Sequence, residues 1–371
     1  MTKPDFRAEL AHLLPGLEMH QIQRVLITKL SAMGDILHAL PVSAALGKAF
    51  PHLEISWACE EMFEPLLSGN PFLSNIITLP KLKIKSLKSS NYRSEYLRYL
   101  KDIRSRKFDL AIDLQGLTKS ALISFASGAK YKIGYHWLRE AAPFIEKAIP
   151  KRLESVHIVD QYLDVARFLG ADVSHVEFPF TISEEDSEVA GKLLEAGGID
   201  SEKAFVVINP AAGHPLKEWG AENYAELIDR LWTEYQLPTA LVTADLQAAA
   251  AVERRTHVPF VNLAGKTSLK QLGAVLMKSV VQICGDTGSA HMSAALNRPV
   301  ITLIGPTDPD RACPHNQRAN VISGRSRCGK KCDWHHCEYA IPKCLSEIEV
   351  GDAVRKVNGI LNNGNGTLPG Y

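Results

Sequence analysis

Two series of short apolar runs alternate with amphipathic stretches, and this alternation restricts the fold more than any other feature of the chain. The first series contains RVLITKL, LEISWAC, SNIITLP and DLAIDLQG, and the second contains AFVVINPAAG, PTALVTA, VVQICGD and PVITLIGP. Strands that alternate with helices predict parallel βαβ units, because parallel strands need a crossover connection. The sequence therefore predicts two doubly wound α/β domains.

The boundary between the two domains is expected where an extended segment leads through a polar helix into a Gly-Gly turn, within FPFTISEEDSEVAGKLLEAGGIDSEK. Two similar domains of this kind are expected to face a cleft. We assign an N-terminal extension, a first Rossmann-like domain, a second Rossmann-like domain, and a C-terminal helix with a flexible tail to residues 1–23, 24–182, 183–345 and 346–371.

Composition excludes some functions and leaves others open. The 371 residues carry a formal net charge of +1, so overall charge predicts no nucleic-acid partner. No apolar run reaches the roughly 18 residues expected of a membrane span, and the N-terminus has no basic start followed by an apolar signal core. These features predict a cytoplasmic protein.

The stretch VVQICGDTGSAHMSAALNRP predicts a strand, a tight turn and a helix, with Asp286, Thr287 and Gly288 at the turn and His291 in the first helical turn. A helix N-terminus presents unpaired N–H groups and a partial positive charge, so it suits phosphate. Taken alone, the D-T-G motif is better explained by a capped turn without a ligand, because helix caps are common. Lys217 follows another strand, within NPAAGHPLKEW, and is either a phosphate-binding cation or a solvated surface lysine.

Asp35 stands in KLSAMGDILHALP, directly after the strand RVLI and at the start of a helix. One interpretation makes it a helix N-cap, because Asp is favoured at that position. The other makes it a general base, because an acceptor hydroxyl is a poor nucleophile until a positioned base takes its proton.

Three motifs occur in order on βα turns: K-x-S-x-M-G-D, K-x-W and G-D-T-G-x-x-H. Together they resemble the glycosyltransferase family 9 heptosyltransferases, over roughly residues 24–310, and several segments are most similar to the type I enzymes. The resemblance implies a GT-B fold, with the acceptor bound by the first domain and ADP-heptose by the second. It implies transfer of L-glycero-D-manno-heptose, with inversion, to Kdo of the lipid A inner core, without a required metal.

The resemblance also implies roles for individual residues. Asp35 matches the catalytic base of the family. Thr287, Gly288 and His291 match donor contacts, and Asp286 matches a contact to the donor sugar or its phosphate. A single displacement with inversion needs one base, and the departing ADP needs positive potential, which Lys217 and the helix beginning near Thr287 supply.

A basic run extends from Lys81 to Lys107 and contains ten cations and two acids. Such a run is often a solvated face, but the resemblance implies an acceptor-binding region here. We predict that Lys81, Lys83, Lys85 and Lys88 contact Kdo carboxylates or lipid A phosphates, and that the anionic inner leaflet of the inner membrane is a second target.

The cysteine segment CGKKCDWHHCEYAIPKC departs from the type I enzymes and is more like some type II members. Its spacing allows a structural zinc or iron site, or four reduced thiols. The four cysteines are Cys328, Cys332, Cys337 and Cys344.

Two acidic features bear on the nucleotide and on metals. The motif DPD, Asp308–Asp310, is interpreted as a turn rather than a metal site. The helix after PTALVTA lacks the acidic cluster that grips the donor ribose in type I enzymes, and Glu253 lies further along.

The sequence therefore predicts an ADP-heptose:lipopolysaccharide heptosyltransferase acting on Kdo. A type II enzyme that adds heptose to heptose is the nearest alternative. An epimerase of the same fold needs further acid and base groups that the sequence does not provide. A non-catalytic protein that binds a nucleotide sugar or lipid A is an alternative of another class.

Overall fold

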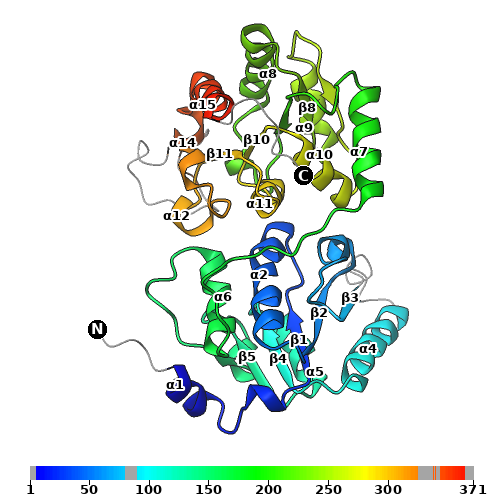
Figure 1. Cartoon of the computed structure of the whole chain (residues 1–371), viewed down its shortest axis with the longest axis vertical. Helices are drawn as coiled ribbons and strands as arrows, with labels where there is room; N and C mark the ends of the chain where they lie inside the picture. Colours follow the sequence, from blue (N-terminus) through cyan, green and yellow to red (C-terminus); the bar gives the residue numbers. More distant parts are fainter. Residues whose placement is uncertain (1–5, 80–89, 325–336, 338, 340–342, 364–371) are drawn as a thin grey trace. The chain divides into compact units, whose positions relative to one another are not determined.

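The structure, a computed structural model, describes residues 6–79, 90–324, 337, 339 and 343–363. The chain divides into two compact units, Met1–Thr181 and Ile182–Tyr371 (Figure 1). The boundary expected from the sequence, between residues 182 and 183, lies one residue beyond this division. Each unit is an α/β unit built around its own parallel sheet.

The sheet of the first unit has six strands in the order β3-β2-β1-β4-β5-β6, and all of its pairs are parallel. From β1 the chain adds β2 and β3 on one side, then crosses back to place β4 on the other side of β1. The strand order therefore reverses between β1 and β4. This is the doubly wound order, whose switch point lies between β1 and β4. The strands are β1 Arg24–Thr28, β2 Glu54–Glu60, β3 Asn75–Leu79, β4 Leu110–Asp113, β5 Tyr131–Gly134 and β6 Lys147–Ala148.

Burial explains why the central strands are mostly apolar. Val25, Leu26 and Ile27 of β1 have no exposed surface, as expected for a parallel strand covered on both faces. Helix α2 is also apolar along most of its length, and its residues from Ile36 to Leu46 are buried. The helices are α1 Phe6–Leu13, α2 Met33–Ala49, α4 Ser90–Ser105, α5 Thr118–Ser127 and α6 Ile158–Phe168, with shorter 3₁₀ turns η1 Met19–Gln21, η2 Glu61–Leu66 and η3 Ala142–Phe144.

The second unit repeats the same arrangement. Its six parallel strands have the order β9-β8-β7-β10-β11-β12, so β7 and β10 occupy the central places that β1 and β4 occupy in the first unit. The two doubly wound sheets predicted from the sequence are therefore confirmed. The strands are β7 Val206–Asn209, β8 Thr239–Leu241, β9 Val261–Asn262, β10 Val281–Gly285, β11 Val300–Ile304 and β12 Val321–Ser323.

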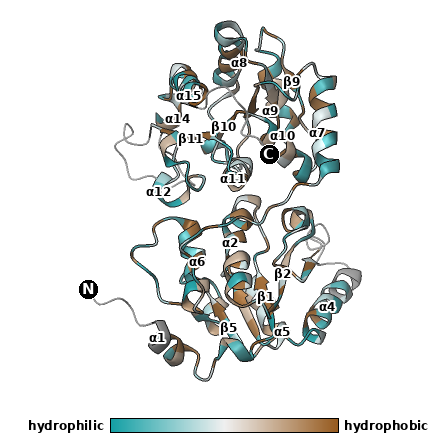
Figure 2. Cartoon of the chain, in the orientation of Figure 1, coloured by the Kyte–Doolittle hydropathy of each residue, from teal (hydrophilic) through white to brown (hydrophobic). Residues whose placement is uncertain are grey.

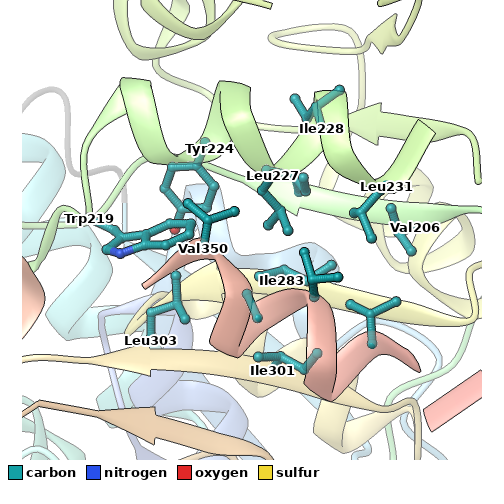
Figure 3. Packing of buried hydrophobic residues seen from close by; sticks show 14 of the residues in the cluster. Val206, Trp219, Tyr224, Leu227, Ile228, Leu231, Ile283, Ile301, Leu303 and Val350 are labelled. Atoms are coloured by element: carbon teal, nitrogen blue, oxygen red, sulfur yellow. The ribbon is translucent and has the colours of Figure 1, made fainter. Parts of the chain in front are cut away.

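The core of the second unit includes the last helix of the described chain. Helix α8 packs its apolar face on the sheet, and Val350 of α15 reaches the same cluster (Figure 3). Trp219 fixes this contact, because its Nε1 donates a hydrogen bond of 3.0 Å to the carbonyl of Ile348. The C-terminal helix is therefore an integral part of the second unit. The helices are α7 Glu184–Ala196, α8 Ala221–Tyr235, α9 Leu246–Glu253, α10 Leu269–Lys278, α11 Gly288–Ala295, α12 Pro309–Ala312, α14 Lys343–Ser346 and α15 Val350–Asn363, with 3₁₀ turns η4 Pro215–Lys217 and η5 Arg318–Asn320.

Hydropathy follows the layers of each unit. Strand β1 is drawn in the hydrophobic colour, whereas α7 is drawn mainly in the hydrophilic colour (Figure 2). Within the described part of the chain, every helix is too short or too polar to cross a bilayer.

Candidate functional site

Asp35, the candidate base, lies at the switch point of the first sheet. Thr28, the last residue of β1, pairs in register with Asp113, the last residue of β4. The segments that follow these two strands leave the same edge of the sheet, where doubly wound proteins bind their ligands. One segment carries Asp35 and the other carries Gln115.

Asp35 does not cap its helix. The N-cap of α2 is Ala32, and Asp35 lies in the first helical turn. This excludes the capping interpretation, although a carboxylate is still favoured there by the helix dipole. The Asp35 carboxylate is 48% exposed, and its Oδ2 lies 3.8 Å from Nζ of Lys29, whose side chain is only 3% exposed. A buried cation thus stands beside an accessible carboxylate.

Contacts with two aromatic residues, Tyr162 and Trp57, fix the position of Lys29. Its Nζ donates a hydrogen bond of 2.8 Å to the hydroxyl of Tyr162 in α6 and lies 5.0 Å from the centre of that ring. Its backbone carbonyl accepts a hydrogen bond of 3.2 Å from Nε1 of the buried Trp57. Sequence reasoning did not single out Lys29, although it opens the K-x-S-x-M-G-D motif. The contact with Tyr162 spans 133 residues, and local pattern does not reveal it.

Gln115 supports the loop that leads to Asp35. Its Oε1 accepts hydrogen bonds from the backbone N–H groups of Leu30 and Ser31, at 3.2 and 3.3 Å. The backbone N–H groups of Gln115 and Gly116 donate in turn to Oδ1 of Asp113, at 2.7 and 2.9 Å. The end of β4 is therefore connected by side-chain hydrogen bonds to the segment after β1.

Asp113 shares its buried site with Glu146. Burial raises the pKa of Asp113, and burial and the Asp113 charge raise the pKa of Glu146 to about 9. Asp113 accepts three hydrogen bonds, including one of 2.7 Å from Oγ of Ser120. These donors favour the ionised form of Asp113, so at neutral pH the proton of the pair resides on Glu146.

Because Glu146 holds this proton in the folded protein, the stability of the fold is expected to depend on pH. The pKa of Glu146 is raised on folding, so the folded protein binds more protons than the unfolded chain, and stability falls as pH rises from about 4.5 toward 9. The change Glu146→Gln keeps the neutral, hydrogen-bonding state at all pH values. We expect the melting temperature of this variant to fall less between pH 6 and pH 10 than that of the unchanged protein.

Thermal unfolding at both pH values, followed by circular dichroism, measures the effect. The matched control is Glu154→Gln, because Glu154 is an exposed glutamate on the same connection between β6 and α6. Equal pH dependence in the unchanged protein and in the Glu146→Gln variant would contradict the shared-proton assignment.

Lys217 and Asp286 form an ion pair in the second unit. Lys217 Nζ lies 2.6 Å from Oδ2 of Asp286, which also accepts a hydrogen bond of 2.7 Å from Oγ1 of Thr307. His291 Nε2 lies 3.7 Å from the other carboxylate oxygen. Gly285 permits this arrangement, because a Cβ at that position would stand 3.0 Å from the carbonyl oxygen of Lys217. Sequence reasoning did not single out Thr307.

The surroundings of Asp286 keep it ionised. Burial alone would raise its pKa, but His291 and the charge of Lys217 outweigh burial and hold the pKa of Asp286 well below its ordinary value. The side chains of Asp286 and Lys217 are 11% and 21% exposed. Lys217 is therefore a fixed, largely buried cation and not a solvated surface lysine.

Thr287 is the N-cap residue of helix α11, but its side chain makes no capping hydrogen bond. Its Oγ1 instead lies 2.9 Å from Oγ of Ser289. Ser289 Oγ also receives hydrogen bonds from Asn209 and from Gln282, at 3.0 and 2.7 Å. Either of the two hydroxyls can donate the hydrogen bond that joins Thr287 and Ser289. This network fixes the first turn of α11 on strands β7 and β10.

Other acidic residues singled out from the sequence have structural partners. Asp308 caps the short helix α12 through the N–H of Asp310, and Asp310 Oδ1 lies 2.6 Å from Nε of Arg318. The motif therefore begins the short helix α12, where a turn was predicted. Glu253, at the end of α9, accepts a hydrogen bond of 3.1 Å from Asn262.

Several predicted site residues lie outside the described residues: Lys81, Lys83, Lys85, Lys88, Cys328 and Cys332. The other two cysteines of the segment are described. Cys344 is buried and belongs to the hydrophobic cluster of the second unit, and Cys337 is half-buried. Among the residues that the structure describes, no group of three or more His, Cys, Asp or Glu side chains is placed to hold a metal ion.

The sequence matches one family over much of its length. The profile of glycosyltransferase family 9 (heptosyltransferase) matches residues 96–339, which is more than half of the chain. The chain belongs to this family. It is therefore a glycosyltransferase, and the resemblance stated from its three motifs is confirmed.

Curated relatives agree with the family. The chain is 27% identical over 309 residues to the lipopolysaccharide core heptosyltransferase OpsX of Haemophilus influenzae, covering 80% of this chain and 83% of that protein. It is 28% identical over 290 residues to lipopolysaccharide heptosyltransferase 1 of Salmonella typhimurium, covering 77% of this chain and 89% of that protein.

Solved structures agree on the fold. E. coli ADP-heptose LPS heptosyltransferase II superposes with a TM-score of 0.75 at 22% identity, covering 92% of this chain and all of that one. The E. coli heptosyltransferase WaaC with ADP gives a TM-score of 0.72 at 24% identity, covering 91% and 100%. The GT-B fold predicted from the sequence is confirmed.

Proposed function

We propose that this glycosyltransferase moves L-glycero-D-manno-heptose from ADP-heptose to Kdo of the lipid A inner core, with inversion and release of ADP. The observation that carries the proposal is the Lys217–Asp286 pair at the start of α11. A fixed cation beside the N–H groups of a helix N-terminus suits a diphosphate. Relatives named as lipopolysaccharide heptosyltransferases support the sugar and the acceptor class.

In the first unit, Asp35 acts as the general base. It takes the proton of the Kdo hydroxyl while that oxygen bonds to the anomeric carbon of heptose and the bond to the diphosphate oxygen breaks. ADP leaves with the electron pair of that bond. One displacement of this kind inverts the anomeric centre and requires a single base. Lys29 and Gln115 position the carboxylate through the contacts described above.

In the second unit, Lys217 and the first turn of α11 stabilise the charge that develops on ADP. Thr287, Gly288 and His291 contact the donor. An ammonium has three hydrogens, and Asp286 and the diphosphate share those of Lys217. Asp286 therefore orients Lys217. Its remaining lone pairs accept a hydrogen bond from a sugar hydroxyl and not from the phosphate, because a carboxylate and a phosphate repel each other.

A panel of nucleotide sugars tests the donor. The protein is incubated with ADP-heptose, ADP-glucose, UDP-glucose and GDP-mannose in the presence of Kdo-lipid A, and the released nucleotide is measured. We expect release from ADP-heptose and at least tenfold slower release from the others. Release from UDP- or GDP-sugars alone would overturn the assignment of the donor.

The acceptor is anionic, and the proposal assigns Lys81, Lys83, Lys85 and Lys88 to its carboxylates and phosphates. These lysines precede helix α4, whose described residues continue the basic run with Arg98, among others. The enzyme then works at the inner face of the inner membrane, in peripheral contact with it.

We also propose that the cysteine segment holds a structural zinc or iron ion, while transfer itself uses no metal. Cys344 packs in the core of the second unit, so a metal there would tie the segment to that core. Protein purified without an affinity tag is expected to contain close to one equivalent of zinc or iron by mass spectrometry. The double variant Cys328→Ser/Cys332→Ser should contain little. Substoichiometric metal in the unchanged protein would contradict the proposal.

A further inference from the structure

Three adjoining elements of the first unit expose large apolar side chains. Helix α5 packs against both α4 and η3. Leu97 of α4, Leu122 and Phe125 of α5, and Phe144 of η3 are all exposed, Phe125 at 66% and Phe144 at 91%. We call the surface that carries these four side chains the α4–α5–η3 face. Singly exposed apolar residues need no explanation, but a group on adjoining elements marks an interaction surface.

The helices present these side chains on their outward faces. Tyr99, Leu100 and Ile103 of α4 face the core of the unit. Leu97 lies on the flank of the helix beside them, and its side chain is 57% exposed. Leu122 and Phe125 stand three residues apart on α5, so they share one face, whereas Ile123 between them is buried. The exposed side chains are therefore directed to solvent and are not part of the core.

Cations surround the apolar side chains. On α4, Lys101 and Arg104 follow Leu97 by four and seven residues and so lie on its face. The guanidinium of Arg104 lies over Gly128, directly after α5, where an added Cβ would stand 1.1 Å from it. Arg104 therefore brings a positive charge to the end of the helix that carries Phe125.

The chain around α5 and η3 is basic as well. Residues 117–157 contain seven Lys or Arg and three Glu, and no Asp. Glu146 is buried. Glu140 accepts a hydrogen bond of 2.9 Å from the N–H of Thr118 at the start of α5. Glu140 and Glu154 are exposed, and two of the seven cations, Lys119 and Arg152, pair with Glu60 and Glu9. The five remaining Lys and Arg still outnumber the two exposed glutamates, so the net charge of this stretch is positive.

We propose that the α4–α5–η3 face docks on an anionic lipid bilayer, with Leu97, Leu122, Phe125 and Phe144 inserted at the headgroup level and the surrounding cations on the lipid headgroups. A surface that combines aromatic and aliphatic side chains with Lys and Arg fits the interfacial region of such a membrane. The proposal names a membrane-binding surface for the proposed function, but it rests on exposure and charge and not on the reaction.

Vesicle flotation without any substrate tests the docking. The full-length protein is mixed with vesicles of phosphatidylethanolamine and phosphatidylglycerol, or of phosphatidylcholine alone. We expect binding to the anionic vesicles, at least fivefold less binding to the neutral ones, and weaker binding in 0.5 M salt, because exposed charges are screened. The double variant Phe125→Ser/Phe144→Ser should lose at least four fifths of the bound fraction.

The matched control is Leu246→Ser, which removes an apolar side chain that is 62% exposed in the second unit. It should bind vesicles like the unchanged protein. Absence of binding to anionic vesicles, or equal binding by the Phe125→Ser/Phe144→Ser variant, would overturn the proposal. A dimer in solution that this variant dissociates would assign the face to a second copy of the chain and overturn it too. Nucleotide release from ADP-heptose is measured separately, so failure of docking and failure of the proposed function are distinguishable.

Discussion

Replacing Asp35 by Asn is expected to lower kcat by about 10²- to 10⁴-fold, the usual contribution of a general base. The amide has nearly the same size and stays at the half-exposed position beside Lys29, but it does not accept the hydroxyl proton. Binding of ADP should be unchanged, because the diphosphate contacts are assigned to the second unit. Steady-state transfer and calorimetric titration with ADP measure the two quantities.

The control for this variant is Glu61→Gln, which neutralises an exposed carboxylate of η2 in the same unit. It should retain full activity and the same melting temperature. An Asp35→Asn variant with kcat within threefold of the unchanged protein would remove Asp35 as the base. Loss of ADP binding together with kcat would instead indicate a folding defect.

Replacing Lys217 by Met is expected to have the second large effect, on donor binding. It removes the cation assigned to the diphosphate, and a hydrogen bond to a charged group contributes roughly 1.5–3 kcal/mol, so the Kd for ADP should rise by about 10- to 100-fold. It also leaves Asp286 in a site that is 11% exposed without its closest countercharge. Removing one partner of a buried pair is strongly destabilising, so the melting temperature should fall.

The double variant Lys217→Met/Asp286→Asn separates these two effects. It removes both charges, so the stranded carboxylate is gone and the melting temperature should recover much of the loss. ADP binding should stay weak, since the cation is still absent. A double variant that binds ADP as tightly as the unchanged protein would show that Lys217 acts on stability alone.

The sequence predicted the architecture because the alternation of strands and helices is a local signal. The strands that escaped it are β5 Tyr131–Gly134, β12 Val321–Ser323 and the two shortest, β6 Lys147–Ala148 and β9 Val261–Asn262. Two residues carry too little periodicity to be read, and these strands exist because a neighbouring strand pairs with them. The packing of α15 into the second unit was missed for a similar reason, since it depends on contacts with α8.

The site was predictable where one turn carries several functional residues, and not where distant segments meet. Asp286, Thr287 and Gly288 are consecutive, so a single motif names them. Thr307 lies 21 residues from Asp286, and Gln115 lies 85 residues from Leu30. Such partners are set by which strands are neighbours and by their register, as in the pairing of Thr28 with Asp113. Glu146 gave no signal, because its burial beside Asp113 is a tertiary property.

The most direct test of the proposed function is the identity of the product. The purified protein is incubated with ADP-heptose and either Kdo-lipid A or the same acceptor that already carries one heptose, and the lipids are analysed by mass spectrometry. We expect Kdo-lipid A to gain one heptose with release of one equivalent of ADP. Transfer to the heptosylated acceptor alone would identify a type II enzyme, and tight binding of ADP-heptose without any product would contradict catalysis itself.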